Sequence, residues 1–198
     1  MRTKALVAAL GCILSFTVAA QGGGVPTFRG SDHIGVTVPD LDEAVKFFVE
    51  VMGCEAFYKM GPFKADDDWM AVHLGVPART EIPKLTMIRC GYGTNIELFD
   101  YRPPQQNTAY PVNSDIGGHH IGFLVDDMDA AVAYLKSNGV RVQGEPTKMT
   151  QGPTAGETWV YFMAPWGTQL ELTYYPKGLA YEKSVTGQVL WNPAKPDK

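Results

Sequence analysis

HIGVTVPDLDEAV, at residues 33–45, recurs as HIGFLVDDMDAAV at residues 120–132. Eight of the thirteen positions are identical, and each copy begins with a histidine. A shorter repeated pair lies downstream in each half, GTNIELFDY at residues 93–101 and GTQLELTYY at residues 167–175. Each of these copies contains one glutamate. The chain therefore carries a duplicated unit that supplies one histidine and one glutamate per copy.

The long repeats are predicted to form a strand followed by a helix. Ile34, Val36 and Val38 alternate with smaller or polar residues, which is the period of a half-buried strand. Asp40, with a glutamate three residues later, resembles a capping box, and Gly53 is the predicted helix end. The helix of the second copy is expected to begin after an equivalent aspartate.

Further strands complete each copy. They are predicted at residues 54–59, 85–90 and 94–100 in the first copy, and at residues 140–143, 158–163 and 169–174 in the second. The expected fold class is therefore α+β, with two tandem β-α-β-β-β modules that form one curved, mixed-sheet cup.

The start of the chain has the features of a secretory signal peptide. Residues 1–20 combine Arg2 and Lys4 with a mostly apolar run and a small-residue site before Gln21. The alternative is an N-terminal membrane anchor, but the run is short for a spanning helix. The predicted location is periplasmic or secreted.

The remaining chain is long enough for one domain with a sizeable core. The expected organisation is a flexible leader at residues 21–30, a single domain at residues 31–176 and a C-terminal tail at residues 177–198. Within the domain, the first module is placed at residues 31–101 and the second at residues 118–176.

Composition restricts the class of partner. The net charge of −4 and the absence of a basic run predict no nucleic-acid partner, and no membrane partner after signal cleavage. A small-molecule substrate is expected, and a homodimer is left open. Cys54 and Cys90, which remain after signal cleavage, allow at most one intramolecular disulfide. The sequence leaves open whether they pair.

Four repeated side chains are the candidate metal ligands. Their apolar neighbours should face the helices, so all four should project from the opposite face of the sheet. They are His33, Glu97, His120 and Glu171. Imidazole and carboxylate groups suit one divalent ion: zinc, nickel, cobalt, manganese or iron(II). A single histidine or glutamate is more often structural, but the recurrence of both indicates a site. His119 should point to the other face.

This ligand set indicates a reaction class. A six-coordinate ion would leave two positions for neighbouring oxygens of a hydroxy-ketone, polarising its carbonyl and acidifying the adjacent C–H bond. Glu171 or Glu97 would act as the base, with Glu171 favoured, and the intermediate would be a metal-bound enediolate. Returning the proton elsewhere gives isomerisation or epimerisation.

Residues 31–176 resemble the vicinal oxygen chelate superfamily, which includes glyoxalase I, methylmalonyl-CoA epimerase, extradiol dioxygenases, and fosfomycin and bleomycin resistance proteins. The resemblance implies paired β-α-β-β-β modules of the glyoxalase type, with a metal bound by the four repeated side chains. Extradiol dioxygenases and fosfomycin enzymes use two histidines and one glutamate. Glyoxalase I and the epimerases have a fourth ligand where Glu97 stands, so Glu97 favours isomerase, epimerase or lyase chemistry.

Two segments resemble a narrower branch, the valiolone-type cyclitol epimerases, which act on sugar-derived cyclic ketones. These segments are DDDWM at residues 66–70 and the stretch at residues 152–167. The signal peptide disfavours a lactoylglutathione lyase-like activity, because glutathione and CoA substrates are mainly cytosolic. Two alternatives remain. One is an iron(II) extradiol-type dioxygenase that uses His33, His120 and Glu171, and the other is a protein that binds an antibiotic or similar small molecule.

Substrate contacts are expected from unrepeated residues. The insertion at residues 60–84 is a candidate lid or cup wall. The candidate contacts are Arg89, Trp69, Lys148, Tyr161 and Trp166.

Overall fold

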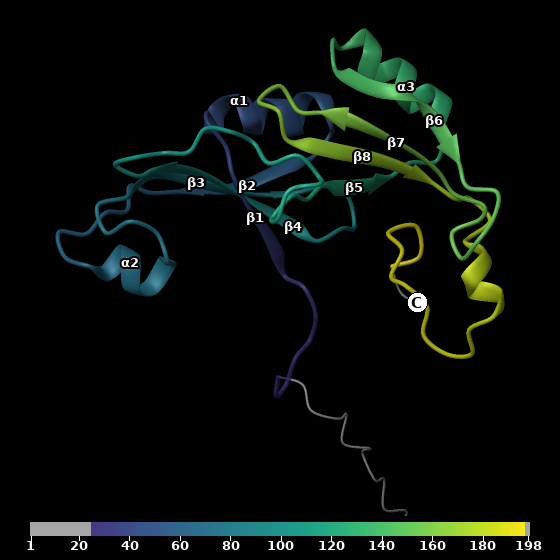
Figure 1. The fold of residues 1–198 in the computed structure, drawn as a ribbon, viewed down its shortest axis with the longest axis horizontal. Helices are drawn as coiled ribbons and strands as arrows, with labels where there is room; N and C mark the ends of the chain where they lie inside the picture. Colours follow the sequence, from purple (N-terminus) through teal and green to yellow (C-terminus); the bar gives the residue numbers. More distant parts are fainter. Residues whose placement is uncertain (1–24, 197–198) are drawn as a thin grey trace, which may run out of the picture. The chain divides into compact units, whose positions relative to one another are not determined.

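The computed structural model describes residues 25–196, and the compact unit that carries the repeats spans Ser31–Lys198. It contains two modules of like topology (Figure 1). The predicted signal peptide and residues 21–24 of the predicted leader lie outside the described residues. In the part of the chain that the structure describes, no helix has the length and apolar character needed to cross a membrane.

The first module is a four-stranded mixed sheet with one covering helix. Its strand order is β1-β4-β3-β2, in which β1 is parallel to β4 and the other neighbours are antiparallel. The strands are β1 (His33–Thr37), β2 (Glu55–Met60), β3 (Glu81–Arg89) and β4 (Asn95–Arg102).

The second module repeats this arrangement. Its order is β5-β8-β7-β6, again with a parallel pair, β5 and β8, at one edge. The strands are β5 (Ile121–Leu124), β6 (Arg141–Lys148), β7 (Thr158–Met163) and β8 (Gln169–Tyr174). The predicted α+β class and the two β-α-β-β-β modules are confirmed. The sheet expected to be continuous is divided into two four-stranded sheets.

Helices α1 and α3 begin where their aspartate caps were predicted. Helix α1 (Leu41–Lys46) follows Asp40, whose carboxylate accepts the Glu43 backbone N–H at 2.9 Å. Helix α3 (Met128–Ser137) follows Asp127, which accepts from the Ala130 N–H at 3.0 Å. Both caps satisfy a free backbone donor of the first turn. Helix α1 continues as a π-helical turn, η1 (Phe47–Val51), rather than as α-helix up to Gly53.

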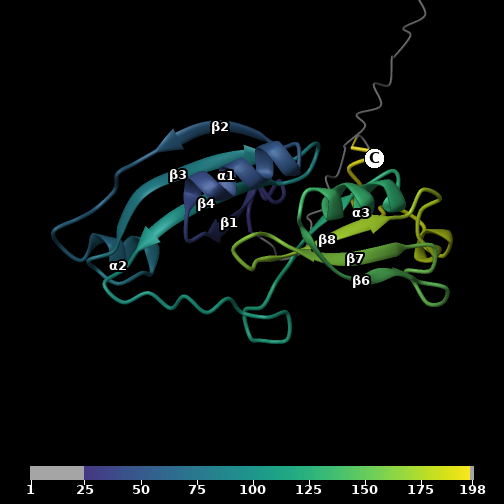
Figure 2. The ribbon, with the colours of Figure 1, turned by 90° about the horizontal axis from the view of Figure 1, so that it is seen from above.

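Apolar and polar residues alternate along the central strands β4 and β8, and this alternation determines which face of each sheet the helix covers. Ile96 and Leu98 are buried on either side of Glu97, and Leu170 and Leu172 are buried on either side of Glu171. Figure 2 shows α1 lying across the first sheet and α3 across the second. The open face of each sheet, meaning the face opposite its helix, therefore carries the glutamate.

One hydrophobic core includes residues of both modules. Trp166, in the turn between β7 and β8, packs against Phe47 and Phe48 of η1, with ring centroids 5.6 and 5.9 Å apart. The modules of one chain thus share apolar packing on the helix-covered side.

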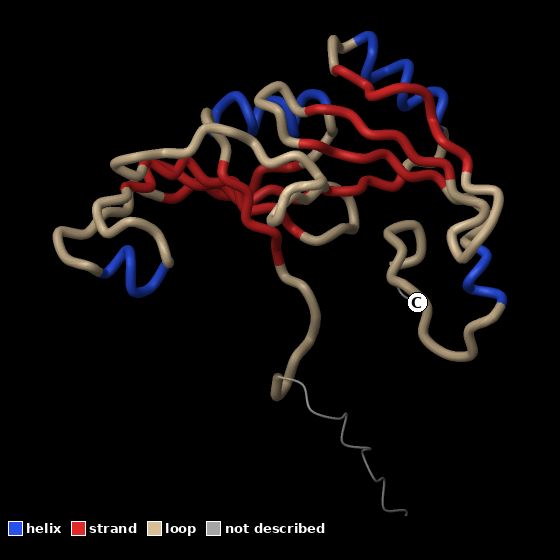
Figure 3. The backbone as a smooth tube through the Cα atoms, viewed as in Figure 1, coloured by secondary structure: helices blue, strands red, loops and turns tan. Residues whose placement is uncertain are grey.

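The connection between β2 and β3 departs most from the sequence prediction. It contains a short helix, α2 (Trp69–Leu74), which Figure 3 shows within a long loop. Strand β3 begins at Glu81, four residues earlier than predicted, and β6 extends to Lys148. Met70 packs with Ile82 and Leu85 in a second apolar cluster that also contacts Phe99 and Tyr101. This cluster attaches α2 to the far end of the first sheet.

Cys54 and Cys90 form a disulfide, which answers the question that the sequence left open. The bond joins the residue before β2 to the residue after β3. In the tail, a 3-10 turn, η2 (Ala180–Lys183), is held on the second module by backbone bonds from Ala180 to Ala155 and from Tyr181 to Pro153.

Candidate metal centre

The first module brings His33 and Glu97 together. His33 begins β1 and Glu97 lies on β4, and the parallel register places Glu97 opposite Gly35, two residues along the same face. The imidazole Nε2 lies 3.3 Å from a Glu97 carboxylate oxygen. The pair therefore follows from strand period and register alone.

The second module forms the equivalent pair. His120 directly precedes β5, and its Nε2 lies 3.2 Å from a Glu171 carboxylate oxygen. Gly122 stands opposite Glu171 in the register. A Cβ atom at Gly122 would lie 3.4 Å from the Glu171 carboxylate, at the limit of ordinary van der Waals contact.

The four predicted ligands form two pairs and not one group of four. Among residues 25–196, no cluster of three or more His, Cys, Asp or Glu side chains is placed to hold a metal ion. The physical reason lies in the topology. Each glutamate strand pairs with the histidine strand of its own module, whereas β1 and β5 are edge strands of different sheets. The prediction that all four side chains hold one ion stays a prediction.

The donor set of each pair nevertheless fits a divalent ion. Each pair brings one imidazole nitrogen within 3.3 Å or less of one carboxylate oxygen, and both atom types are accepted zinc and first-row metal ligands. We call each pair a half-site: His33 with Glu97 is the first half-site, and His120 with Glu171 is the second. A site with all four ligands requires the edge strands β1 and β5 to lie next to each other.

The remaining nitrogen of each imidazole also has a partner, and the two partners differ. His33 Nδ1 lies 2.8 Å from the Asp32 carboxylate, and this hydrogen bond is the main cause that raises the pKa of His33. His120 Nδ1 lies 3.3 Å from the Asn113 side-chain amide. Sequence reasoning missed both partners. His119 Nδ1 lies 3.2 Å from the Gly117 carbonyl oxygen within its own loop.

The second half-site is the more desolvated environment for a base. Burial raises the pKa of Glu171, the charge of Glu157 raises it further, and His120 opposes the shift. Tyr161 lies opposite Glu171 in the β7–β8 register, with its ring edge-on to His120 at 5.0 Å between centroids. Burial, followed by the charge of Glu171, raises the pKa of Tyr161.

The other predicted substrate contacts are scattered. Arg89 is exposed, and its Nε donates to the Gly91 carbonyl at 2.8 Å. Lys148 is exposed at the end of β6. Trp166, also predicted as a substrate contact, is partly buried and packs against the shared core, and its indole N–H donates to Thr168 Oγ1. Its role in substrate binding stays a prediction.

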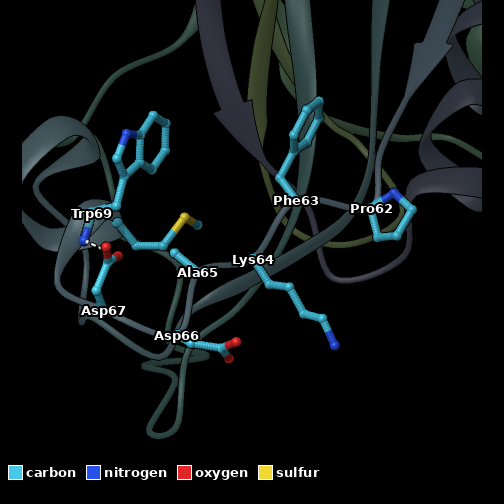
Figure 4. A pocket seen from close by; sticks show the side chains of 8 residues that line it. Pro62, Phe63, Lys64, Ala65, Asp66, Asp67 and Trp69 are labelled. Carbon is cyan, nitrogen blue, oxygen red and sulfur yellow. Dashed lines mark hydrogen bonds between the residues drawn. The ribbon is translucent and has the colours of Figure 1, made fainter.

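Trp69 lies in the insertion, where it lines a pocket of about 700 Å³ (Figure 4). The Trp69 backbone N–H donates to the Asp67 carboxylate at 3.0 Å, and its ring lies 4.8 Å from the His73 ring. The pocket is lined by Pro62, Phe63, Lys64, Ala65, Asp66, Asp67, Trp69 and Met70. Both apolar rings and charged groups are thus available there.

Comparison with known proteins places this chain and its fold in a family. Residues 32–161 match the model of the glyoxalase/bleomycin resistance protein/dioxygenase superfamily. The chain belongs to this superfamily. It is 48% identical over 165 residues to a protein named 2-epi-5-epi-valiolone epimerase from Actinomyces sp., covering 83% of this chain and 89% of that protein.

Solved structures of the superfamily share the fold. A glyoxalase family protein from Bacillus cereus matches with a TM-score of 0.58 at 19% identity, over 76% of this chain and 98% of the other. One from Enterococcus faecalis matches with a TM-score of 0.52 at 18% identity, over 74% and 98%.

These relatives confirm the predicted superfamily and glyoxalase-like fold. The 48% identical relative also confirms the prediction of an epimerase-type enzyme. Members of the superfamily commonly bind a divalent metal.

Proposed function

We propose that this chain is a metal-dependent epimerase that acts on a hydroxylated cyclic ketone of the valiolone type. The observation that carries the proposal is the presence of two matching His–Glu pairs in a chain 48% identical to a 2-epi-5-epi-valiolone epimerase. Because Glu97 is paired with His33 just as Glu171 is paired with His120, four ligands are favoured over the three-ligand set of a dioxygenase.

His33, Glu97, His120 and Glu171 would hold the ion. When bound, a divalent metal would act as a Lewis acid on the ketone oxygen and its neighbouring hydroxyl. The protein supplies the proton transfer. Glu171 takes the proton from the carbon beside the carbonyl, and the electron pair of that C–H bond moves toward the carbonyl oxygen. A proton from solvent then adds to the opposite face of that carbon to give the epimer, and Glu171 releases the abstracted proton to solvent.

Residues of the open faces suit a ring-shaped polar substrate. Phe99 and Tyr101 stack with centroids 4.9 Å apart on the Glu97 face, and Trp159 lies 5.1 Å from Tyr161 on the Glu171 face. Aromatic surfaces can contact the carbon skeleton of a cyclitol while the tyrosine hydroxyls bond its hydroxyl groups. The pocket beside Trp69 adds lysine and aspartate side chains.

We further propose that two copies of the chain assemble the complete site. Each copy presents two half-sites next to free sheet edges, β1 and β5. A second copy that places its β5 beside β1 would join His33 and Glu97 to the partner copy's second half-site. Edge strands are the natural place for such an association.

The proposed location is the periplasm or the exterior of the cell. The Cys54–Cys90 disulfide supports this, because structural disulfides persist in oxidising compartments and are rare in the cytosol.

The decisive test combines metal content with hydrogen exchange. Metal-loaded protein, incubated in deuterated water with hydroxylated cyclic ketones, should incorporate one deuterium beside the carbonyl and interconvert two epimers. His120→Ala should lose both metal and exchange, while His119→Ala is the matched control at the neighbouring histidine and should keep them. Full metal occupancy in His33→Ala or His120→Ala would contradict the site, and a metal-loaded enzyme that exchanges no ketone in the panel would contradict the reaction.

A further inference from the structure

The two copies of the repeat differ immediately before the ligand histidine. Asp32 precedes His33, whereas His119 precedes His120. Asp32 bonds the Nδ1 atom of its neighbour at 2.8 Å, but His119 is engaged with the Gly117 carbonyl. The second half-site obtains its Nδ1 partner from elsewhere, namely from Asn113, seven residues earlier in the connection between the modules.

A tight loop positions Asn113. The Val112 N–H donates to the Asp115 carboxylate at 3.0 Å, and the Asp115 and Gly118 N–H groups donate to the Val112 and Asp115 carbonyls at 2.9 and 2.8 Å. A Cβ atom at Gly118 would lie 2.2 Å from the Val112 carbonyl oxygen, so the loop closes this tightly only around glycine. The side-chain amide is thereby held against the imidazole.

The chemistry of the two Nδ1 partners differs. A carboxylate can only accept, so Asp32 requires a proton on His33 Nδ1, and His33 Nε2 is then free to bind a metal when it is deprotonated. An amide can either donate or accept, depending on which end faces the ring. Asn113 therefore permits either tautomer of His120.

The positions of the side-chain atoms favour one of these tautomers. Asn113 Nδ2 can only donate, and it lies 3.3 Å from His120 Nδ1. A ring that accepts at Nδ1 carries its proton on Nε2, which lies 3.2 Å from the Glu171 carboxylate. The Asn113 Oδ1 atom is buried and has no hydrogen-bond partner among the described residues. Rotating the amide by half a turn would give Oδ1 a donor, the Nδ1–H, and would free Nε2 for a metal.

We propose that Asn113 is a positioning residue that sets the tautomer of His120 by rotation of its side-chain amide. In the metal-free protein the amide donates to Nδ1, and Nε2–H bonds Glu171. In the metal-loaded protein the amide oxygen accepts from Nδ1–H, and Nε2 binds the ion. The metal-loaded half of this inference rests on the proposed function, whereas the metal-free half does not.

The test reads the His120 ring directly. Nitrogen-15 NMR of the ring, assigned by its loss in His120→Ala, should show the Nε2–H tautomer in the metal-free wild type and the Nδ1–H tautomer after addition of Zn²⁺. Asn113→Asp presents only acceptors, as Asp32 does, and should protonate Nδ1 even without metal. Ser114→Ala, at the exposed neighbouring position, is the control and should leave the tautomer unchanged.

A second readout is zinc affinity, measured by competition with a chromogenic chelator. Asn113→Leu cannot bond Nδ1 and should weaken zinc binding by about 10–100-fold, the usual effect of losing such a partner. An unchanged affinity in folded Asn113→Leu, or the same metal-free tautomer in the wild type and Asn113→Asp, would overturn the inference. If Asn113→Leu does not fold, the Asn113→Asp spectrum decides. A wild type that binds no zinc would refute the proposed function, while the metal-free spectra would still decide the role of Asn113.

Discussion

Glu97 and Glu171 occupy equivalent positions, but their surroundings differ. Glu171 lies beside Tyr161, and burial raises its pKa. Glu171→Gln keeps a metal-binding oxygen but removes the base, and it should slow hydrogen exchange by about 10²–10⁴-fold. Glu97→Gln should retain more exchange per bound metal ion. Deuterium incorporation divided by metal content measures this, and a greater loss in Glu97→Gln would assign the base to Glu97.

Asp42 on α1 accepts hydrogen bonds from Lys84 and Lys59, which lie on β3 and β2. These bonds lower its pKa from 3.8 to about 2. Because folding lowers the pKa of Asp42, its ionised carboxylate stabilises the folded state at pH values above 3.8. This contribution to stability is lost as the pH falls toward about 2. Asp42→Asn should therefore lower stability at neutral pH and flatten its dependence on pH below about 4.

Urea unfolding midpoints between neutral and acidic pH measure the Asp42 effect. Asp129→Asn, at the equivalent position of the second repeat, is the matched control. Parallel pH profiles of the wild type and Asp42→Asn would show that the two lysines do not stabilise the fold through Asp42.

Single residues were predictable where the repeat and the strand period act together. His33 with Glu97, and His120 with Glu171, follow from alternation and parallel register. Asn113 was not predictable, because it lies in an unrepeated loop and reaches His120 only through loop closure. Asp32 had one available signal, its position directly before a repeated histidine. The packing of Trp166 against the core was not predictable, because a tryptophan in a turn can either face a ligand or pack on the core.

Strands and helix starts were predicted better than helix ends and insertions. β7 and β8 were predicted with the observed boundaries because alternating apolar residues and glycine turns define them. Helix α2 was missed, because its six residues are too few to show a helical period. The π-helical turn η1 was also missed, since its apolar spacing resembles that of an α-helix.

The Cys54–Cys90 bond fastens the start of β2 to the end of β3 across a sequence separation of 36. Closing a loop of this length restricts the unfolded chain and should contribute about 3–4 kcal/mol to the free energy of unfolding. Cys54→Ser with Cys90→Ser should lose this contribution, as measured by urea unfolding. The double variant should be insensitive to dithiothreitol, whereas the wild type should fall to a similar stability when reduced. A reductant-insensitive wild type would contradict a stabilising bond.

The complete molecule has two half-sites per chain, and the proposed dimer can be tested by complementation. His33→Ala retains the second half-site, and His120→Ala retains the first. A dimer containing one chain of each kind should hold one intact site if ligands come from both chains, and should show about half of the wild-type activity.

Such mixed dimers can be isolated by co-expression with two different affinity tags. Dimers made from two differently tagged His33→Ala chains provide the control and should be inactive. Inactive mixed dimers, with both chains confirmed by mass spectrometry, would show that all four ligands come from one chain.

The two ends of the insertion between β2 and β3 are joined by backbone hydrogen bonds. Phe63 and Ile82 exchange both backbone hydrogen bonds at 2.9 Å, so the two ends of the intervening segment meet at one point. A segment with joined ends can be replaced by that of a relative without moving the strands that hold His33 and Glu97, and metal content should survive such a transplant. The first repeat thus carries an insertion between its second and third strands, while the strand framework that positions the His–Glu pairs is the same in both repeats.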